Sequence, residues 1–197
     1  MKLCVFQGTF NPIHNVHLAM AHFAQKKYKF ETVVFVPAYK PPHKDIDDEL
    51  ATHRYNMVKL AIEGENSFQI SNIEYQHERY SYTYLTIQEL KKRYGVEGRV
   101  SFLIGTDAFR EIDGWYEADK LKKEVHFIVF PRTANFDPDR YQRFTEWGYS
   151  YEFAPMNFID LSSTVIRHRT KTGKPLAGIV PPKVQEYIRK NGLYLPK

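Results

Sequence analysis

The sequence predicts an α/β domain with a doubly wound, mostly parallel sheet. Short apolar runs alternate with segments of helical periodicity along the whole chain, which is typical of strand–helix–strand units. Residues 100–105 and 125–130 (VSFLIG and VHFIVF) are continuous apolar runs, as in parallel strands that are buried on both faces. There is no internal repeat or break in composition. We therefore treat residues 1–197 as one domain, with a helical C-terminal part from about residue 160.

Each expected element follows from its local pattern. The expected strands are the apolar runs at 2–7, 32–38, 68–75, 100–105 and 125–130. The expected helices are 17–28, 52–64, 81–95, a segment around 116–123, 162–170 and 181–192. Glycines follow three of these helices, where a left-handed residue commonly ends a helix. Residues 133–155 show the least regular pattern, and we expect them to be a variable insertion.

Composition and charge narrow the class of protein. The chain has 28 Lys and Arg residues against 23 Asp and Glu residues, a net charge of +5. This modest excess, without a dense basic block, fits an enzyme for anionic substrates better than a nucleic-acid-binding protein. No apolar run has the length of a membrane span, and the start of the chain lacks a signal-peptide pattern. Since Cys4 is the single cysteine, we expect a cytoplasmic protein without an internal disulfide.

Residues of unusual type follow four of the expected strands. In a doubly wound sheet, ligands bind beyond the carboxyl ends of the strands. The segments at these ends are Gln7–Thr9, 37–44, Gly105–Asp107 and Pro131-Arg132. We therefore expect these four segments to meet at one edge of the sheet and to form the binding site.

The first of these segments continues as QGTFNPIHNVH and contains His14 and His17. A metal site needs three or four ligands, and no Cys or carboxylate stands beside this pair at ligand spacing. Both histidines could simply pack in the core. A phosphate site explains more, because Gly8 and Thr9 allow close backbone approach and a helix that begins at His17 offers free N–H groups to an anion.

The segment PAYKPPHK at 37–44 has two interpretations. It could be a turn stiffened by prolines, with solvated lysines. It could also present Lys40, His43 and Lys44 to a polyphosphate.

Two further segments have a structural and a functional interpretation. In 160–169 the serines can cap a helix, and together with Arg167 they can also surround an anion. In 104–119, Asp107 could cap a helix or contact a nucleoside. Trp115 could belong to the core or stack on a flat ring.

These segments carry a resemblance over essentially the whole chain. VFQGTFNPIHNVHL resembles the pattern G-G-T-F-[DN]-P-x-H-x-G-H-L of bacterial nicotinate-mononucleotide adenylyltransferases, which are nucleotidyltransferases with an H-x-G-H signature. Further motifs of that family are similar to PPHK at 41–44, SYTYLT at 81–86, LIGTDAF with Trp115-Tyr116, LSSTVIR at 161–167 and NGLY at 191–194. The first and the LSSTVIR motifs are shared across nucleotidyltransferases, and PPHK, SYT and IGxD with WY are more specific.

The resemblance implies a Rossmann-like nucleotidyltransferase topology and a reaction. ATP and nicotinate mononucleotide would give deamido-NAD and pyrophosphate, with Mg²⁺ carried in on ATP and with no organic cofactor, nucleic acid or membrane involved. It implies ATP contacts from Gly8, Thr9, Phe10, His14, His17, Gly105, Asp107, Ser163 and Arg167. It implies mononucleotide contacts from Lys44, Thr83, Trp115, Tyr116 and Arg132. Catalytic roles fall to His14, His17, Lys44 and Arg167, and His17 would stabilise the transition state.

The chemistry of this reaction agrees with those residue types. The second pKa of a phosphate monoester is near ~6, so the attacking phosphate is already mostly dianionic at neutral pH. The reaction therefore needs no general base, and it does need in-line positioning and neutralisation of charge. Histidine, lysine and arginine recur in the four segments, whereas an acid–base pair does not.

Three alternatives remain open from the sequence. A pantetheine-phosphate adenylyltransferase usually has threonine where His14 stands and lacks PPHK. Nicotinamide mononucleotide could be the acceptor, although helix-start amides near Thr83 and Tyr116 would favour a carboxylate. The chain could also be a weakened nucleotide- or RNA-binding domain, which Val16 supports. A homo-oligomer is compatible with all of these.

Three positions depart from the family pattern, namely Gln7, Val16 and Ala38. Val16 replaces a glycine that leaves room for adenine, and its β-branched side chain adds bulk there. We predict that the adenine shifts or that ATP binds more weakly, so that Val16→Gly lowers the KM for ATP. An unchanged KM in a steady-state titration of ATP would contradict this steric effect.

Overall fold

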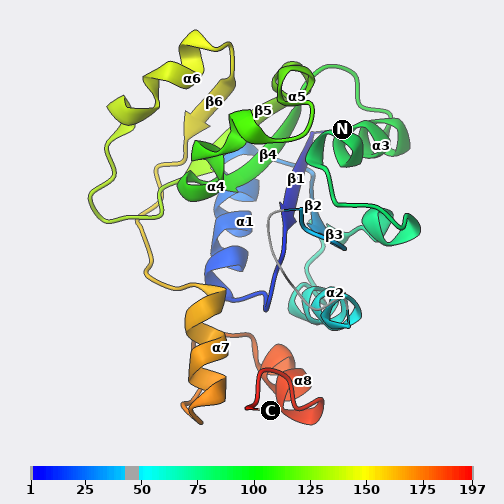
Figure 1. Cartoon of the computed structure of the whole chain (residues 1–197), viewed down its shortest axis with the longest axis vertical. Helices are drawn as coiled ribbons and strands as arrows, with labels where there is room; N and C mark the ends of the chain where they lie inside the picture. Colours follow the sequence, from blue (N-terminus) through cyan, green and yellow to red (C-terminus); the bar gives the residue numbers. More distant parts are fainter. Residues whose placement is uncertain (1, 43–48, 197) are drawn as a thin grey trace.

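The sheet has the strand order of a doubly wound fold. The computed structural model describes residues 2–42 and 49–196, and its strands are ordered β3-β2-β1-β4-β5-β6 with every neighbouring pair parallel (Figure 1). The strand bounds are β1 Leu3–Gly8, β2 Thr32–Pro37, β3 Phe68–Ile70, β4 Val100–Gly105, β5 Val125–Phe130 and β6 Ser150–Phe153. This confirms the predicted α/β class with its mostly parallel sheet, and β1 and β4 meet where the strand order reverses.

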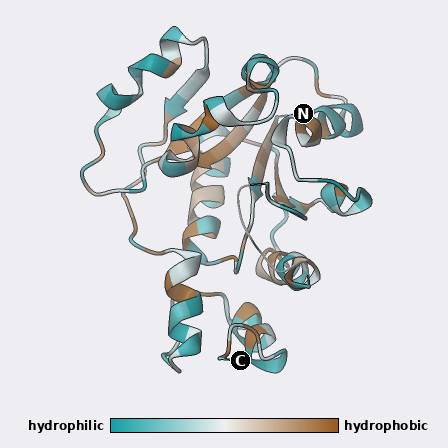
Figure 2. Cartoon of the chain, in the orientation of Figure 1, coloured by the Kyte–Doolittle hydropathy of each residue, from teal (hydrophilic) through white to brown (hydrophobic). Residues whose placement is uncertain are grey.

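Helices cover both faces of the sheet. Along β1, Cys4 and Phe6 belong to one core cluster, and Leu3 and Val5 belong to the other, because successive strand residues point to opposite faces. The first cluster is covered by α1 Asn15–Tyr28, α2 Leu50–Ala61, α7 Ser163–Lys171 and α8 Pro182–Lys190. The second is covered mainly by α3 Thr83–Tyr94, α4 Thr106–Arg110, α5 Ala118–Glu124 and α6 Gln142–Glu146. Figure 2 shows apolar strands between helices with hydrophilic outer surfaces.

Two expectations about the elements were wrong, and a third segment differs from its expected pattern. The expected strand 68–75 ends at Ile70, and the 3₁₀ turn η1 (Ile73–Gln76) follows, because the side chain of Glu74 turns inward to accept hydrogen bonds. The segment 133–155 is more regular than its pattern indicated, since it holds η3 (Pro138–Tyr141), α6 and the strand β6, and its nature as a variable insertion stays a prediction. Helix α1 begins at Asn15 with His14 as its extended N-cap residue, so His17 is the third helical residue and does not start the helix.

The C-terminal segment is attached to the loop after β1 and to the start of α1. The Asn15 N–H donates to the carbonyl of Ile179 at 3.0 Å, and its side-chain amide donates to Gly178 at 2.9 Å. The Tyr194 hydroxyl donates to Oδ1 of Asn11 at 2.6 Å. Figure 1 shows α7 and α8 together at one end of the molecule, beyond the sheet. Among the helices in the described part of the chain, none is long and apolar enough to cross a bilayer.

Candidate active site

A cavity of about 760 Å³ opens at the carboxyl ends of β1 and β4, where the strand order reverses. A doubly wound sheet places its ligand in this crevice. Most of the residues singled out in the sequence line this cavity, namely Gly8, Thr9, Phe10, His14, His17, Gly105, Asp107, Trp115, Arg132, Ser163 and Arg167. The expectation that the strand-end segments meet at one edge is therefore met for the segments after β1, β4 and β5.

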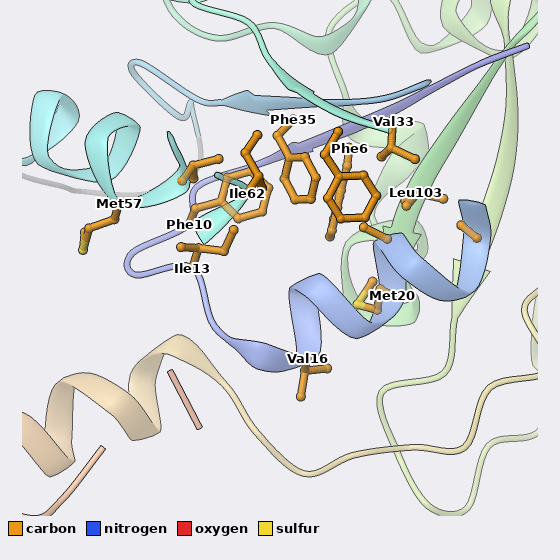
Figure 3. Packing of buried hydrophobic residues seen from close by; sticks show 14 of the residues in the cluster. Phe6, Phe10, Ile13, Val16, Met20, Val33, Phe35, Met57, Ile62 and Leu103 are labelled. Carbon is orange, nitrogen blue, oxygen red and sulfur yellow. The ribbon is translucent and has the colours of Figure 1, made fainter. Parts of the chain in front are cut away.

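The loop after β1 is shaped by the contact of Gly8 with Phe10. Phe10 has a φ of 49°, is 2% exposed, and packs edge-on against Phe6 with ring centroids 5.3 Å apart (Figure 3). A Cβ atom on Gly8 would lie 3.0 Å from the Phe10 Cζ, closer than an ordinary van der Waals contact, so the ring would have to shift. Glycine at this position therefore lets the ring fold back under the loop and leaves the backbone open to the cavity.

The two histidines form one unit at the start of α1. Their rings stack with centroids 3.7 Å apart, and the backbone N–H of His14 donates to Nδ1 of His17 at 3.2 Å. Because Nδ1 of His17 accepts this bond, the proton of the neutral ring lies on Nε2. His17 can thus donate from Nε2 to a ligand in the cavity that both rings line.

His14 is neutral at physiological pH in the unliganded protein. Its side chain is buried, and this burial, together with the positive charge of Arg132, lowers its pKa to about 3. A neutral imidazole presents one N–H donor and one acceptor. An anionic ligand between His14 and Arg132 would offset the repulsion and raise the pKa of His14 again.

Helix α7 brings a second set of donors to the cavity. The Ser162 side chain caps the helix by accepting from the Val165 N–H at 3.3 Å, and Ser162, Ser163 and Thr164 all line the cavity. Arg167 donates through Nη1 to the carbonyl of Asn11 at 2.8 Å. The start of α7 thus points its free N–H groups and a guanidinium at the loop after β1, an arrangement that favours anions.

The segments after β4 and β5 contact each other in the wall of the main cavity. The Arg132 N–H donates to the Thr106 hydroxyl at 3.0 Å. A Cβ on Gly105 would lie 3.0 Å from Cγ of Arg132, so glycine lets the arginine stem cross the end of β4. Asp107 follows in α4 and is largely exposed at the cavity rim.

A second cavity of about 560 Å³ adjoins the first, and both are lined by Gly8, Thr9 and Trp115. Its other walls come from Pro41 and Pro42, from the start of α3 at Tyr82 and Thr83, and from Tyr116. The rings of Tyr82 and Tyr116 stack at 4.5 Å. The predicted residues Thr83 and Tyr116 therefore lie in this second cavity, with Trp115 shared between the two.

The sequence interpretation missed Arg54, which joins the loops after β1 and β2. Its guanidinium is fully buried and donates to the carbonyls of Thr9 at 2.9 Å, Tyr39 at 3.0 Å and Ala38. Thr9 lines both cavities and Ala38 lines the second. The sequence does indicate that Arg54 is buried. It stands three and four residues before Met57 and Val58, and this helical spacing places it on the core face of α2.

The sequence interpretation also missed Glu74, which holds the same loop from the opposite side. Its buried carboxylate accepts from the backbone N–H of Tyr39 at 3.1 Å, from the hydroxyl of Thr86 at 2.7 Å, and from the Gln7 side-chain amide. Burial raises the pKa of Glu74 despite these donors, which favour the ionised form. Gln7, one of the three departures from the family pattern, thus has a structural partner.

Lys44 and Val16 are not among the described residues that line the main cavity. Lys44, like His43, lies outside the described residues. Val16 is buried and does not line the main cavity; it lines a hollow of about 10 Å³ with Met156 and Ile159, room for about one water. Figure 3 shows its side chain directed away from Phe10. The predicted effect of Val16→Gly on ATP therefore requires the base to reach this small hollow beside Val16.

The metal interpretation of the two histidines gains no support from their surroundings. Across residues 2–42 and 49–196, no three His, Cys, Asp or Glu side chains gather where they could hold a metal ion. The neighbours of His14 and His17 are instead aromatic rings, backbone amides and arginines. The donors that line the cavity suit a phosphorylated, anionic ligand of the kind that α/β proteins bind at this edge of the sheet.

The comparison with known families agrees with this class of site. The pattern of the cytidylyltransferase-like family matches residues 5–169. The chain belongs to this family.

Curated relatives match over nearly the whole length. The chain is 39% identical to a probable nicotinate-nucleotide adenylyltransferase of Caldicellulosiruptor saccharolyticus, over 98% of this chain and 99% of the relative. It is 36% identical to the nicotinate-nucleotide adenylyltransferase of Bacillus subtilis, over 98% of each chain. Its fold resembles that of a Plasmodium falciparum nicotinic acid mononucleotide adenylyltransferase solved with NaAD, with a TM-score of 0.79 at 20% identity, covering 98% of this chain and 96% of that one.

The depressed pKa of His14 predicts a pH dependence of stability. An unfolded histidine titrates near ~6.5, so between this value and about 3 the unfolded chain binds a proton that the folded protein does not. The free energy of unfolding should therefore fall as the pH falls, by about 2 kcal/mol from His14 between pH 7 and pH 5. Urea unfolding of the wild type and of His14→Asn at both pH values measures this difference.

The exposed His168 supplies the matched control for this experiment. His168→Asn should keep the wild-type pH dependence, whereas His14→Asn should lose about 2 kcal/mol of it. An equal pH dependence in all three proteins would show that His14 is not held neutral by the fold.

Proposed function

We propose that the protein transfers the adenylyl group of ATP to nicotinate mononucleotide, giving deamido-NAD and pyrophosphate in NAD biosynthesis. The observation that carries the proposal is the pair of adjoining cavities where the strand order reverses. One is lined by hydrogen-bond donors that suit phosphate groups, and the other is lined by aromatic rings. The full-length similarity to curated nicotinate-nucleotide adenylyltransferases supports the same reaction.

The larger cavity suits ATP. Its phosphates would lie among His14, His17, the start of α7 and Arg167, where histidine N–H groups, free amides and a guanidinium converge. Gly105 and Asp107 would be at the adenosine, and Lys44 would add a charge from the loop after β2. The same donors would then hold the pyrophosphate that leaves.

The smaller cavity suits the mononucleotide. Trp115 and Tyr116 would frame the pyridine ring, and Thr83 at the start of α3 would meet its carboxylate. Of these two cavities Arg132 lines the larger, so its contact with the mononucleotide would be at the phosphate. The two cavities join at Gly8 and Thr9, where the two reacting phosphates would meet.

The transfer itself needs positioning and charge neutralisation. An oxygen of the mononucleotide phosphate forms a bond to the α-phosphorus of ATP as the bond from that phosphorus to pyrophosphate breaks. Negative charge grows on the leaving group, and the Nε2–H of His17 would stabilise it by donating a hydrogen bond. The nucleophile is already ionised at neutral pH, since its second pKa is near ~6. This agrees with the described residues that line the cavity, among which no carboxylate is paired with a histidine.

Mg²⁺ would enter with the triphosphate as part of the substrate. Mg²⁺ is commonly held by substrate phosphates, waters and one or two carboxylates. The exposed Asp107 at the rim is a carboxylate of the right kind for such an ion. When bound, the ion would neutralise part of the phosphate charge, and the cationic side chains described above would neutralise the remaining charge.

Nicotinamide mononucleotide is the second candidate acceptor. Glu111 lines the smaller cavity, and its charge would oppose a nicotinate carboxylate while leaving an amide unaffected. The start of α3 acts in the opposite direction and favours the carboxylate. The names of the relatives support nicotinate. A cytoplasmic location and a homo-oligomer stay predictions.

Turnover with the two mononucleotides tests the proposal. With ATP and Mg²⁺, we expect pyrophosphate release with nicotinate mononucleotide and a lower kcat/KM with nicotinamide mononucleotide. A coupled pyrophosphate assay measures both. If neither mononucleotide led to pyrophosphate release, adenylyl transfer would be refuted. A higher kcat/KM with nicotinamide mononucleotide would make that compound the acceptor in place of nicotinate mononucleotide.

The His17→Ala variant gives the matching test of mechanism. Removing a donor that acts on the developing charge should lower kcat about a hundredfold or more, with little change in the unfolding midpoint. Turnover close to that of the wild type would remove His17 from the mechanism.

A further inference from the structure

A third cavity lies outside both of the cavities described above. It has a volume of about 380 Å³ and shares no lining residue with the other two. It lies between α4, the loop after β5, η3 and α6. A volume of this size is at the lower end of small-molecule sites, which span about 300–1,000 Å³.

Three arginines converge on this cavity from three different elements. Arg110 ends α4, Arg140 lies in η3, and Arg143 lies in α6. The single carboxylate among the lining residues is Asp137, at 3.5 Å from Nε of Arg140. Asp107, which does not line this cavity, lies near Arg110, so two carboxylates face three guanidiniums and an excess of positive charge remains. Since like charges repel, this arrangement gains stability when an anion joins it.

Local contacts orient two of the three guanidiniums. Arg143 lies over the rings of Phe144 and Trp147, at 4.9 and 5.4 Å from their centroids, and donates to the Arg110 carbonyl at 3.3 Å. Arg110 lies 3.7 Å from Asp107 and also interacts with the Tyr141 hydroxyl. Arginines that are oriented in this way lose less conformational freedom when they bind an anion.

The remaining lining residues suit a phosphorylated small molecule. Thr133 and Asn135 supply neutral hydrogen-bond donors, and the half-buried ring of Phe136 supplies an apolar wall. Arginine forks match phosphate oxygens, which they bind with two parallel hydrogen bonds. We propose that this cavity is a second anion site, which binds a small phosphorylated metabolite independently of the main site. Its neighbours in the chain, Asp107 and Arg132, belong to the main cavity.

Titration with inorganic pyrophosphate at low salt and without Mg²⁺ tests the proposal. The wild type should bind one equivalent in the main cavity and a second in the third cavity. Arg110→Ala/Arg140→Ala should weaken the second event at least about tenfold, since a hydrogen bond to a charged group contributes about 1.5–3 kcal/mol. The double variant Arg93→Ala/Arg99→Ala removes two exposed arginines elsewhere and should bind as the wild type does.

The main-cavity variant Arg167→Ala separates this proposal from the proposed function. It should weaken the first event and leave the second unchanged. If the main cavity binds no pyrophosphate, the wild type would show one event, which Arg110→Ala/Arg140→Ala removes and Arg167→Ala keeps. Unchanged binding in a folded Arg110→Ala/Arg140→Ala variant would overturn the proposal. Should that variant unfold, Arg140→Ala alone decides, because its side chain is 81% exposed.

Discussion

The site depends on one buried guanidinium. Arg54 donates hydrogen bonds to carbonyls of the loops that follow β1 and β2. The Glu74 carboxylate accepts a hydrogen bond from the backbone N–H of Tyr39 in the second loop. These bonds turn two neighbouring strand ends into one rigid rim, and that rim borders both main cavities through Thr9. A buried charge with its hydrogen bonds made is costly to disturb. These hydrogen bonds therefore fix the described parts of the two loops relative to each other.

On this rim the chemistry is chiefly electrostatic. The proposed reaction joins two polyanions, so the protein must offer donors and positive charge without neutralising itself by internal ion pairs. His14 is kept neutral by burial and by Arg132, and the bond accepted at Nδ1 of His17 leaves the proton of its neutral ring on Nε2. The helix starts at α3 and α7 add amide donors at the two ends of the combined cavity.

The sequence predicts those parts of the molecule that depend on local pattern. The strands 100–105 and 125–130 have the bounds observed for β4 and β5, because continuous apolar runs mark strands buried on both faces. The strand expected at 68–75 was too long, because the pattern of apolar residues does not show that the Glu74 side chain turns inward. In the site, Gly8 and His14 are recognisable by residue type after a strand. Arg54 is not, because its partners lie far away in the sequence and meet it only in the folded chain.

Replacing Arg54 by lysine tests most directly whether the buried clamp positions the site. Lysine keeps the charge but cannot span three carbonyls. We predict that folded Arg54→Lys has a kcat/KM for the mononucleotide lower by about tenfold or more, the equivalent of one lost hydrogen bond to a charged group. Arg99→Lys, at an exposed position, should keep the wild-type value. An Arg54→Lys protein with unchanged kcat/KM would contradict the account.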